Sequence, residues 1–161
     1  MADVTGTFYP GAAAIGYGSQ WLIGQDDGSP ETFVAVADIE SIQFGEMNAP
    51  VVNITHLRSP GRAHEKIATI RDLQPFTMTG NLRLAHGSQS NAGGDGFTTG
   101  GLISLHRDLE ERNMKIVLAD ATELPFAGVI NSLNLGTITL DQPTKFTAQV
   151  QPLRDYTAAL P

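Results

Sequence analysis

Alternation of apolar and polar residues at every second position is the strongest pattern along the chain. From Phe76 to Leu84 the even positions hold apolar residues or glycine and the odd positions hold polar residues, and Thr144 to Val150 repeats this arrangement. On a β-strand, alternate side chains point to opposite faces. The pattern therefore predicts two strands that are each buried on one face only.

Six further segments have the composition of strands. They are rich in Val, Ile, Thr and aromatic residues and are separated by turn-forming residues: Gln20–Ile23, Thr32–Val36, Ile39–Phe44, Val51–His56, Met114–Ala119 and Phe126–Leu133. In the third segment the apolar residues fall at positions 39, 42 and 44. This change of phase predicts a β-bulge.

One segment has the period of a helix. Leucines recur with the spacing i, i+3, i+7 from Leu102 to Leu109, and charged residues occupy the other side. Thr98 or Thr99 is the expected N-cap, and Asn113 is the expected left-handed terminator. Because strands and helices do not alternate, the pattern argues against a doubly wound nucleotide-binding fold. The prediction is a β-rich domain with one helix laid across a sheet.

Length and composition indicate one globular domain. The chain has 161 residues, of which 41% are hydrophobic and 17% are charged, and it contains no cysteine. A disulfide scaffold and a cysteine-ligated metal site are therefore excluded. There is no apolar run of about 18 residues and no basic segment followed by an apolar one at the N-terminus. We expect neither a membrane span nor a secretory signal.

The net charge of −7 is unevenly distributed. Residues 1–57 carry seven acids and neither Lys nor Arg, whereas residues 58–161 carry ten residues of each sign. Arg58, Arg62, Lys66 and Arg71 lie within fourteen positions, with Glu65 as the only acid among them. General nucleic-acid binding, which needs phosphate contacts from Lys and Arg, is disfavoured. The asymmetry suits head-to-tail association of copies, and a solvated mixed surface explains it equally well.

Three segments lack periodicity and are predicted to be mobile: Gly6–Gly18, Pro60–Ala68 and His86–Gly101. The first belongs to an expected flexible N-terminal arm, residues 1–19. Glycines at 93, 94, 96, 100 and 101 suggest a phosphate loop, but that motif needs a lysine and this stretch has none. A flexible Gly-rich linker over residues 86–101 is the better interpretation.

Candidate chemistry is sparse. His56 and His64 lie on either side of a loop, with Glu65 beside the second, and this arrangement suggests a metal site. A third ligand at a useful spacing is not evident, so hydrogen-bonding loop histidines are the simpler interpretation. The Asp26-Asp27-Gly28 sequence lacks the alternating acids of a calcium loop and predicts a hairpin turn. Ser59 is not in a nucleophile elbow. No two carboxylates are singled out as a glycosidase-like pair. We expect no catalytic, cofactor-binding or metal-binding residues.

One segment carries a resemblance to a known family. After the strand that reaches His56, a Ser-Pro-Gly turn leads to a glutamate and then to Ile70-Arg71-Asp72. This segment resembles the tail tube (major tail) proteins of long, non-contractile-tailed bacteriophages, the siphophages. The matching positions are Thr55, Leu57, Ser59, Pro60, Gly61, Glu65 and Asp72; the chain departs from the family at Thr69, where the family has glycine, and at Ile70, where it has leucine.

The resemblance extends along the chain in matching order from Gln20 to Val150. It includes an opening hairpin, the single helix at Leu102–Asn113, a hairpin turning near Asp120 and a closing strand that ends at Val150. It implies a mainly β fold, a β-sandwich or open barrel with one flanking α-helix. In that family six subunits form a ring in which their inner sheets join into one continuous β-barrel, and rings stack into a tube.

The implied function is that of a structural virion protein without enzymatic activity. The implied partners are other copies, the tape-measure protein, the tail terminator and distal tail proteins, and double-stranded DNA in transit without specific binding; no cofactor and no membrane are implied. The protein would lie in the phage tail after synthesis in the host cytoplasm. An acidic chain suits a channel that must not hold DNA. Arg83 and Lys145 nevertheless fall on the polar face of the alternating strands.

A loop over residues 57–72 is the expected assembly loop. Its predicted interface residues are Arg58, Ser59, Pro60, Gly61, Arg62, Glu65, Lys66, Arg71 and Asp72. The N-terminal arm and the Gly-rich loop are expected at contacts between rings or on the outer surface. Two alternatives remain open. One is a related ring component, namely a tail terminator, a distal tail protein, or a contractile-tail or gene-transfer-agent tube; the other is a ligand-binding β-sandwich module.

Overall fold

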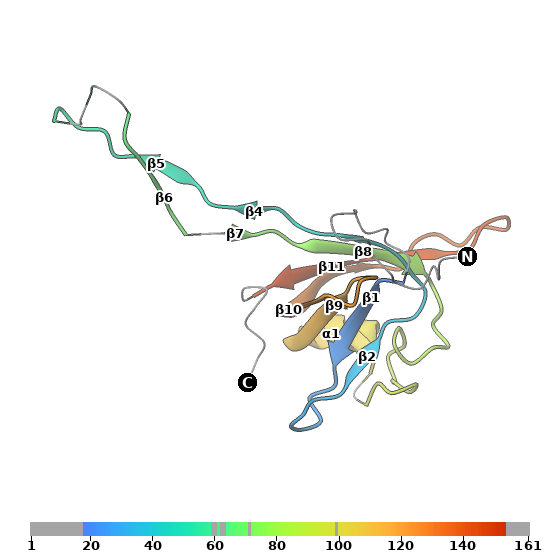
Figure 1. Cartoon of the computed structure of the whole chain (residues 1–161). Helices are drawn as coiled ribbons and strands as arrows, with labels where there is room; N and C mark the ends of the chain where they lie inside the picture. Colours follow the sequence, from blue (N-terminus) through green and yellow to red (C-terminus); the bar gives the residue numbers. More distant parts are fainter. Residues whose placement is uncertain (1–17, 59–60, 62–63, 71, 99, 154–161) are drawn as a thin grey trace, which may run out of the picture.

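A curled antiparallel sheet of seven strands forms the body of the molecule (Figure 1). The computed structural model describes residues 18–58, 61, 64–70, 72–98 and 100–153. The strand order is β2-β1-β9-β10-β11-β8-β3. The strands span Gln20–Gly24 (β1), Phe33–Ala35 (β2), Ile39–Gln43 (β3), Phe76–Asn81 (β8), Arg112–Val117 (β9), Glu123–Asn134 (β10) and Lys145–Pro152 (β11). The sheet remains open between its edge strands, β2 and β3. With one helix beside these strands, the expected mainly β fold is confirmed.

The predicted alternation positions the core. Phe76, Met78 and Gly80 of β8 are buried and their neighbours are not, and β11 alternates in the same way. The predicted bulge is also confirmed, because the register of β3 on β8 shifts between Ile39 and Ser41. A Cβ atom on Gly80 would lie 2.4 Å from the carbonyl oxygen of Asp38. Glycine at position 80 thus lets β3 approach closely beside the bulge.

The helix α1, Leu102–Asp108, is shorter than predicted. Its N-cap residue is Gly101 rather than Thr98 or Thr99, and Leu109 takes the left-handed conformation at its C-terminus with φ = 48°. Asn113 therefore lies in β9 instead of ending the helix. Leu102 and Leu105 are buried, and the helix packs on β10. The leucine spacing predicted the buried face correctly, but it predicted a helix that continues past Leu109, where the structure ends it.

The Gly-rich loop of residues 86–101 is packed against the body, so its interpretation as a flexible linker is wrong. Ser88 and Gln89 are fully buried, and Phe97 belongs to the core. The Gln89 amide Nε2 donates to the carbonyl oxygens of Ala37 and Asn81, and its Oε1 accepts from the backbone N–H of Arg83. The loop is held by polar groups that satisfy buried backbone, which a search for apolar periodicity does not detect.

A long two-stranded ribbon leaves the body between β3 and β8 (Figure 1). We call residues 44–75 the arm. Its strands are β4 (Met47–Asn48), β5 (Val51–Asn53), β6 (Lys66–Ala68) and β7 (Asp72–Leu73). β4 pairs with β7 and β5 pairs with β6, both antiparallel. Part of the segment predicted as a mobile loop is thus the returning strand of the arm.

The connection between β1 and β2 is longer than the two-residue hairpin turn that the Asp-Gly sequence suggests. Residues 25–32 join the two strands, and the Gln25 N–H donates to the Thr32 carbonyl across its base. The Asp27 carboxylate accepts from the Thr32 N–H at 2.8 Å. This hydrogen bond lowers the pKa of Asp27. The aspartate therefore organises a loop within one hairpin.

Candidate functional site

The arm carries more than half of the large exposed apolar side chains among the described residues. Among the described residues, fourteen large apolar side chains are exposed. Eight of these belong to the arm: Phe44, Met47, Val51, Val52, Ile54, Leu57, Ile67 and Ile70. Leu57 is 107% exposed and Ile70 is 90% exposed. Concentrated exposed apolar surface marks a site of protein association.

Apolar residues occupy both faces of the arm. Val52 stands opposite Ile67 on one face, and Val51 stands opposite Ala68 on the other, since facing residues of paired strands share a face. All six residues of β5 and β6 are exposed. A two-stranded ribbon without a core to cover it is marginally stable in water. The arm therefore has the properties of an element that is completed by a partner.

Backbone hydrogen bonds hold the arm in register along its length. Beyond the strands, the Ile54 N–H donates to Glu65, the Thr69 N–H to Pro50 and the Gln74 N–H to Glu46. At the base, a Cβ atom on Gly45 would lie 2.2 Å from the Gln74 carbonyl oxygen. Glycine at this position lets the outgoing and returning segments of the arm meet closely where the arm leaves the body.

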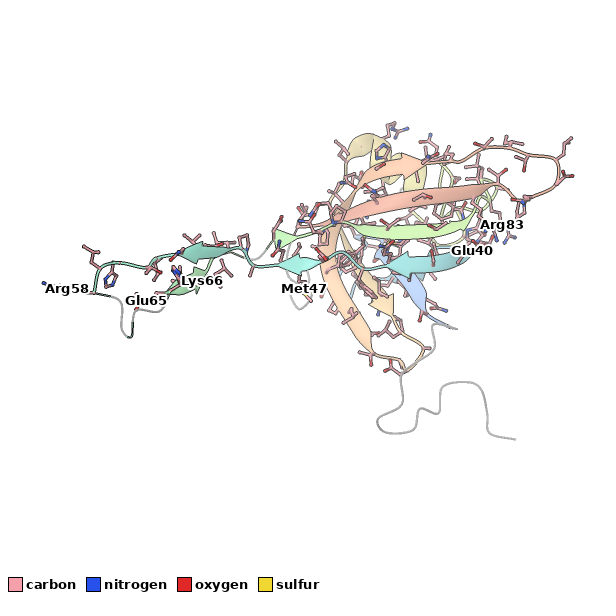
Figure 2. All side chains as sticks on the ribbon, turned by 90° about the horizontal axis from the view of Figure 1, so that it is seen from above. Glu40, Met47, Arg58, Glu65, Lys66 and Arg83 are labelled. Carbon is pink, nitrogen blue, oxygen red and sulfur yellow. The ribbon has the colours of Figure 1, made fainter. Side chains whose placement is uncertain are left out.

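The predicted interface residues that the structure describes all lie on the arm: Arg58, Gly61, Glu65, Lys66 and Asp72. Ser59, Pro60, Arg62 and Arg71 lie outside the described residues. Figure 2 shows Arg58, Glu65 and Lys66 on the outer part of the arm, and Met47 nearer the body. The segment that pattern and resemblance selected therefore projects from the body, and its role as an interface stays a prediction.

The charged groups of the arm make local contacts. The Glu65 carboxylate lies 3.6 Å from His56 Nε2, and the Glu65 N–H donates to the Thr55 hydroxyl. The Arg58 N–H donates to His56 Nδ1. The Asp72 carboxylate accepts from Gln74 Nε2 at 2.8 Å. His56 and Glu65 therefore shape the outer end of the arm, and no group of three or more metal-ligating side chains occurs among the described residues.

Acidic residues of the first third are largely used within the subunit. The Asp38 carboxylate lies 3.5 Å from Arg83 Nη1, and Glu40 lies 2.8 Å from Lys145 Nζ. The Glu31 carboxylate accepts from the Asp26 N–H and from Asn113 Nδ2. Because these carboxylates already have partners within the subunit, fewer acids of the first third remain to pair with basic residues of another copy. They also place the two cations of the polar sheet face beside carboxylates.

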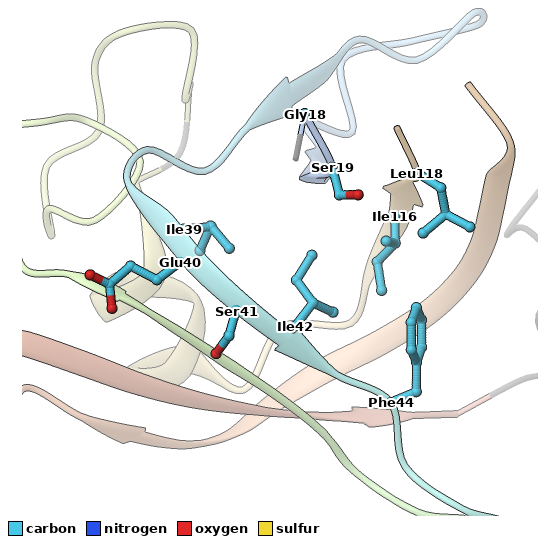
Figure 3. A pocket seen from close by; sticks show the side chains of 9 residues that line it. All are labelled: Gly18, Ser19, Ile39, Glu40, Ser41, Ile42, Phe44, Ile116 and Leu118. Atoms are coloured by element: carbon cyan, nitrogen blue, oxygen red, sulfur yellow. The ribbon is translucent and has the colours of Figure 1, made fainter. Parts of the chain in front are cut away.

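An apolar cleft lies along the open side of the sheet. It measures about 580 Å³ and is lined on one side by β3 and Phe44 and on the other by the end of β9 and the start of β1. Figure 3 shows Ile42 and Phe44 directed toward Ile116 and Leu118, with Glu40 directed away. Its larger lining side chains are mainly apolar, and the lining holds no set of converging polar groups suited to catalysis.

A histidine in the Gly-rich loop has a serine and an aspartate as neighbours. His86 Nδ1 lies 2.8 Å from the Ser88 hydroxyl, and His86 Nε2 lies 3.9 Å from the Asp95 carboxylate. This grouping has the residue types of a catalytic triad. Ser88 is fully buried, however, and its oxygen accepts from the Ala37 N–H. The hydroxyl is closed to substrate, so the grouping fastens the loop to the β2–β3 connection.

Shifted carboxyl pKa values elsewhere have local causes. The Arg107 guanidinium donates to the adjacent Asp108 and lowers the pKa of that carboxyl. In the β9–β10 turn, hydrogen bonds from Thr122 lower the pKa of Asp120. Both are exposed groups in neighbour contacts, unlike the buried clusters that mark catalytic sites. None of the described helices has the length and apolar character needed to cross a membrane.

Comparison with known proteins gives similarity in structure but not in sequence. No protein-family model and no curated protein matches the chain. The fold is similar to a chain from the tail of an empty gene transfer agent (GTA) particle refined with C6 symmetry, with a TM-score of 0.58, 16% identity and coverage of 83% of this chain and 90% of that chain.

Two other solved structures have related folds. A chain from the virion of a native GTA particle has a TM-score of 0.57 and 15% identity, with coverage of 85% of this chain and 95% of that one. A chain from the baseplate of the anti-feeding prophage, resolved with six-fold symmetry, has a TM-score of 0.53 and 9% identity, with coverage of 91% and 94%. The chain thus has the fold of components of phage-tail-like particles.

Proposed function

We propose that this chain is a structural subunit of a phage tail tube, in which hexameric rings stack into a channel for double-stranded DNA. The observation that carries the proposal is the exposed apolar arm on an open sheet, in a fold similar to a tail chain resolved with C6 symmetry. A subunit that functioned alone would leave this surface uncovered.

Two sheet edges are suited to closing a ring. The first is β3, which is an edge strand. The second is part of β10: β9 pairs with it only over Glu123–Gly128, so beyond Gly128 the described structure has β11 on one side of β10 and no strand on the other. The four strands β10-β11-β8-β3 alternate in direction. The free part of β10 would therefore meet β3 of the next copy in antiparallel orientation, and each junction would remove two open edges.

The outward face of this four-stranded unit would line the channel. Its exposed or half-exposed residues are mainly hydroxyls and amides: Thr77, Thr79, Asn81, Thr147 and Gln149. Its cations, Arg83 and Lys145, lie beside Asp38 and Glu40. A surface with balanced charges offers DNA no row of cations to bind, which suits transit without retention.

The remaining assignments follow from the tail tube proposal. The partners would be other copies, the tape-measure protein before ejection, and the tail terminator and distal tail proteins at the two ends. The protein would be located in the virion after synthesis in the host cytoplasm, and it would act without catalysis or cofactor. The siphophage type of tail belongs to this proposal and rests on the sequence resemblance of residues 51–72.

Electron microscopy of the purified protein over a range of concentrations tests the proposal. We expect hexameric rings or hollow tubes from the parent chain and no tubes from Ile67→Asp with Ile70→Asp, which places charges on the exposed arm. Leu109→Asp is the matched control, because Leu109 is also exposed but lies at the end of α1. A parent chain that stays monomeric, even with other tail components, would refute the proposal.

A related ring component is the second candidate, and the fold shared with a baseplate chain favours it. The two candidates differ in stacking. A tube protein adds rings indefinitely, whereas a tail terminator or distal tail protein forms a ring that ends the stack. Isolated rings that never lengthen at high concentration, yet join the end of preformed tubes, would select the second candidate.

A further inference from the structure

A second apolar projection lies at the opposite end of the body from the arm. The loop between β10 and β11, residues 135–144, carries Leu135, Ile138 and Leu140 as exposed apolar side chains, of which Ile138 is 85% and Leu140 is 103% exposed. We call it the distal loop. The arm and the distal loop together hold eleven of the fourteen large exposed apolar side chains among the described residues.

Strand register establishes that the two projections lie at opposite ends. β11 pairs with β8 so that Lys145 faces Asn81 and Val150 faces Phe76. The distal loop precedes Lys145, whereas the arm returns into β8 at Phe76. Figure 2 shows the same separation, with Glu40 and Arg83 at one end of the sheet and Met47 and Arg58 toward the other.

We infer that the arm of one copy packs on the distal loop of another copy in the next ring. This inference rests on the proposed function and names the partner surface of the arm. The two surfaces differ and lie at opposite ends of the same strands. Their contact is therefore heterologous, and it repeats along an axis instead of closing into a pair. Each copy covers one apolar surface of its neighbour and has its own covered in turn.

The composition of the two surfaces supports this pairing over arm-to-arm contact. The outer part of the arm, residues 57–71, carries four cations and one acid, Glu65, whereas the distal loop has neither Lys nor Arg and carries one acid, Asp141. Two arms in contact would bring like charges together, whereas an arm on a distal loop brings cations toward a carboxylate. The apolar contact supplies the association energy, and the charges favour the head-to-tail orientation.

The distal loop has a defined shape for receiving the arm. The Gly136 N–H donates to the Asn134 side chain at 2.8 Å, and the Thr144 carbonyl accepts from the Leu82 N–H at 2.7 Å. Gly136 has φ = +77°, and a Cβ atom there would lie 2.0 Å from the Lys145 carbonyl oxygen. The ends of the loop are therefore fixed to the body while Ile138 and Leu140 remain outside it.

Cysteine cross-linking tests the inference directly, because the chain contains no cysteine of its own. Leu57→Cys and Leu140→Cys are made as single variants, mixed, assembled and treated with a short bismaleimide. We expect a product at twice the subunit mass of 17.2 kDa from the mixture, and a ladder of larger products from the double variant. Leu57→Cys mixed with Leu109→Cys is the control and should give at most background.

A second variant tests the same contact without a cross-linking reagent. Ile138→Asp with Leu140→Asp changes exposed side chains only, so the monomer should unfold at the same denaturant concentration as the parent. We expect it to form rings that do not stack. Normal tubes from this variant would overturn the inference, as would tubes in which arm and distal loop cross-link no better than the control, or in which Leu57→Cys alone cross-links with itself.

The two levels of the proposal fail differently. Parent tubes without the arm-to-loop cross-link leave the tail tube function standing and remove the inference. A parent chain that forms neither rings nor tubes by electron microscopy removes the proposed function, and the arm-to-loop contact is removed with it.

Discussion

The body and the arm are both built from antiparallel strands, but they bury their side chains to very different extents. In β8 and β11 every second side chain is fully buried, and Phe76 packs edge-to-face on Phe126 with ring centroids 5.1 Å apart. In β5 and β6 no residue is buried, although three of their six residues are valine or isoleucine. The same strand-forming residues therefore supply folding energy in one region and binding surface in the other.

This difference explains how one chain can fold first and assemble later. The body buries a core of aromatic and aliphatic residues within a single subunit, so we expect it to fold without a partner. The arm has hydrogen-bonded strands but no core, so it gains most of its hydrophobic energy when another molecule covers it. Substitutions that separate folding from assembly test this division.

The largest effect on folding is expected from Ile130→Ala in the body. Ile130 is fully buried among core residues, so its truncation removes packed methyl groups and leaves a cavity. We expect a loss of about 2–5 kcal/mol in the free energy of unfolding, measured by urea denaturation of the monomer. A loss below about 1 kcal/mol would contradict the description of β10 as a core strand.

A smaller loss is expected from Gln89→Ala in the Gly-rich loop. The substitution removes the amide that serves the Ala37 and Asn81 carbonyls and the Arg83 N–H, all in partly buried surroundings. We expect the free energy of unfolding to fall by about 1–3 kcal/mol, and proteolytic cleavage within residues 86–101 to become faster. Unchanged cleavage would indicate that the loop is held by other contacts.

Ile70→Ala is the matched substitution on the arm. Because Ile70 is 90% exposed, the monomer should change its free energy of unfolding by no more than about 0.5 kcal/mol. The concentration needed for assembly should nevertheless rise, as followed by light scattering. If Ile70→Ala destabilised the monomer as strongly as Ile130→Ala, the arm would be part of the folded core and the comparison would fail.

The smallest effect on folding is expected from Arg58→Glu with Arg62→Glu. Arg58 is exposed, and charge changes at an exposed position cost little in stability, so denaturation should be almost unchanged. We expect weaker assembly by sedimentation, most clearly at low salt, because salt screens exposed charges. Assembly equal to that of the parent at low salt would exclude a role for these cations in subunit pairing.

Local sequence determined much of this molecule. Period-2 alternation predicted β8 and β11 and their buried faces, and the phase change after Ile39 predicted the bulge in β3, because both patterns depend on near neighbours along a strand. The resemblance in residues 51–72 selected a segment that the structure shows as a projection, but it did not predict that shape. The spacing of Leu102 and Leu105 found the buried side of the helix, although its end at Leu109 was missed.

Tertiary structure alone decided which apolar strands are covered. Val51, Val52 and Ile67 predict a strand as well as any core segment does, but burial depends on what else packs nearby, and in the described structure these three side chains remain 48–58% exposed. The Gly-rich loop shows the converse: it has few apolar residues, yet Ser88 and Gln89 are buried because they satisfy backbone groups that are distant in sequence. Strand formation is a local property of the chain, whereas burial is set by contacts between segments far apart in sequence.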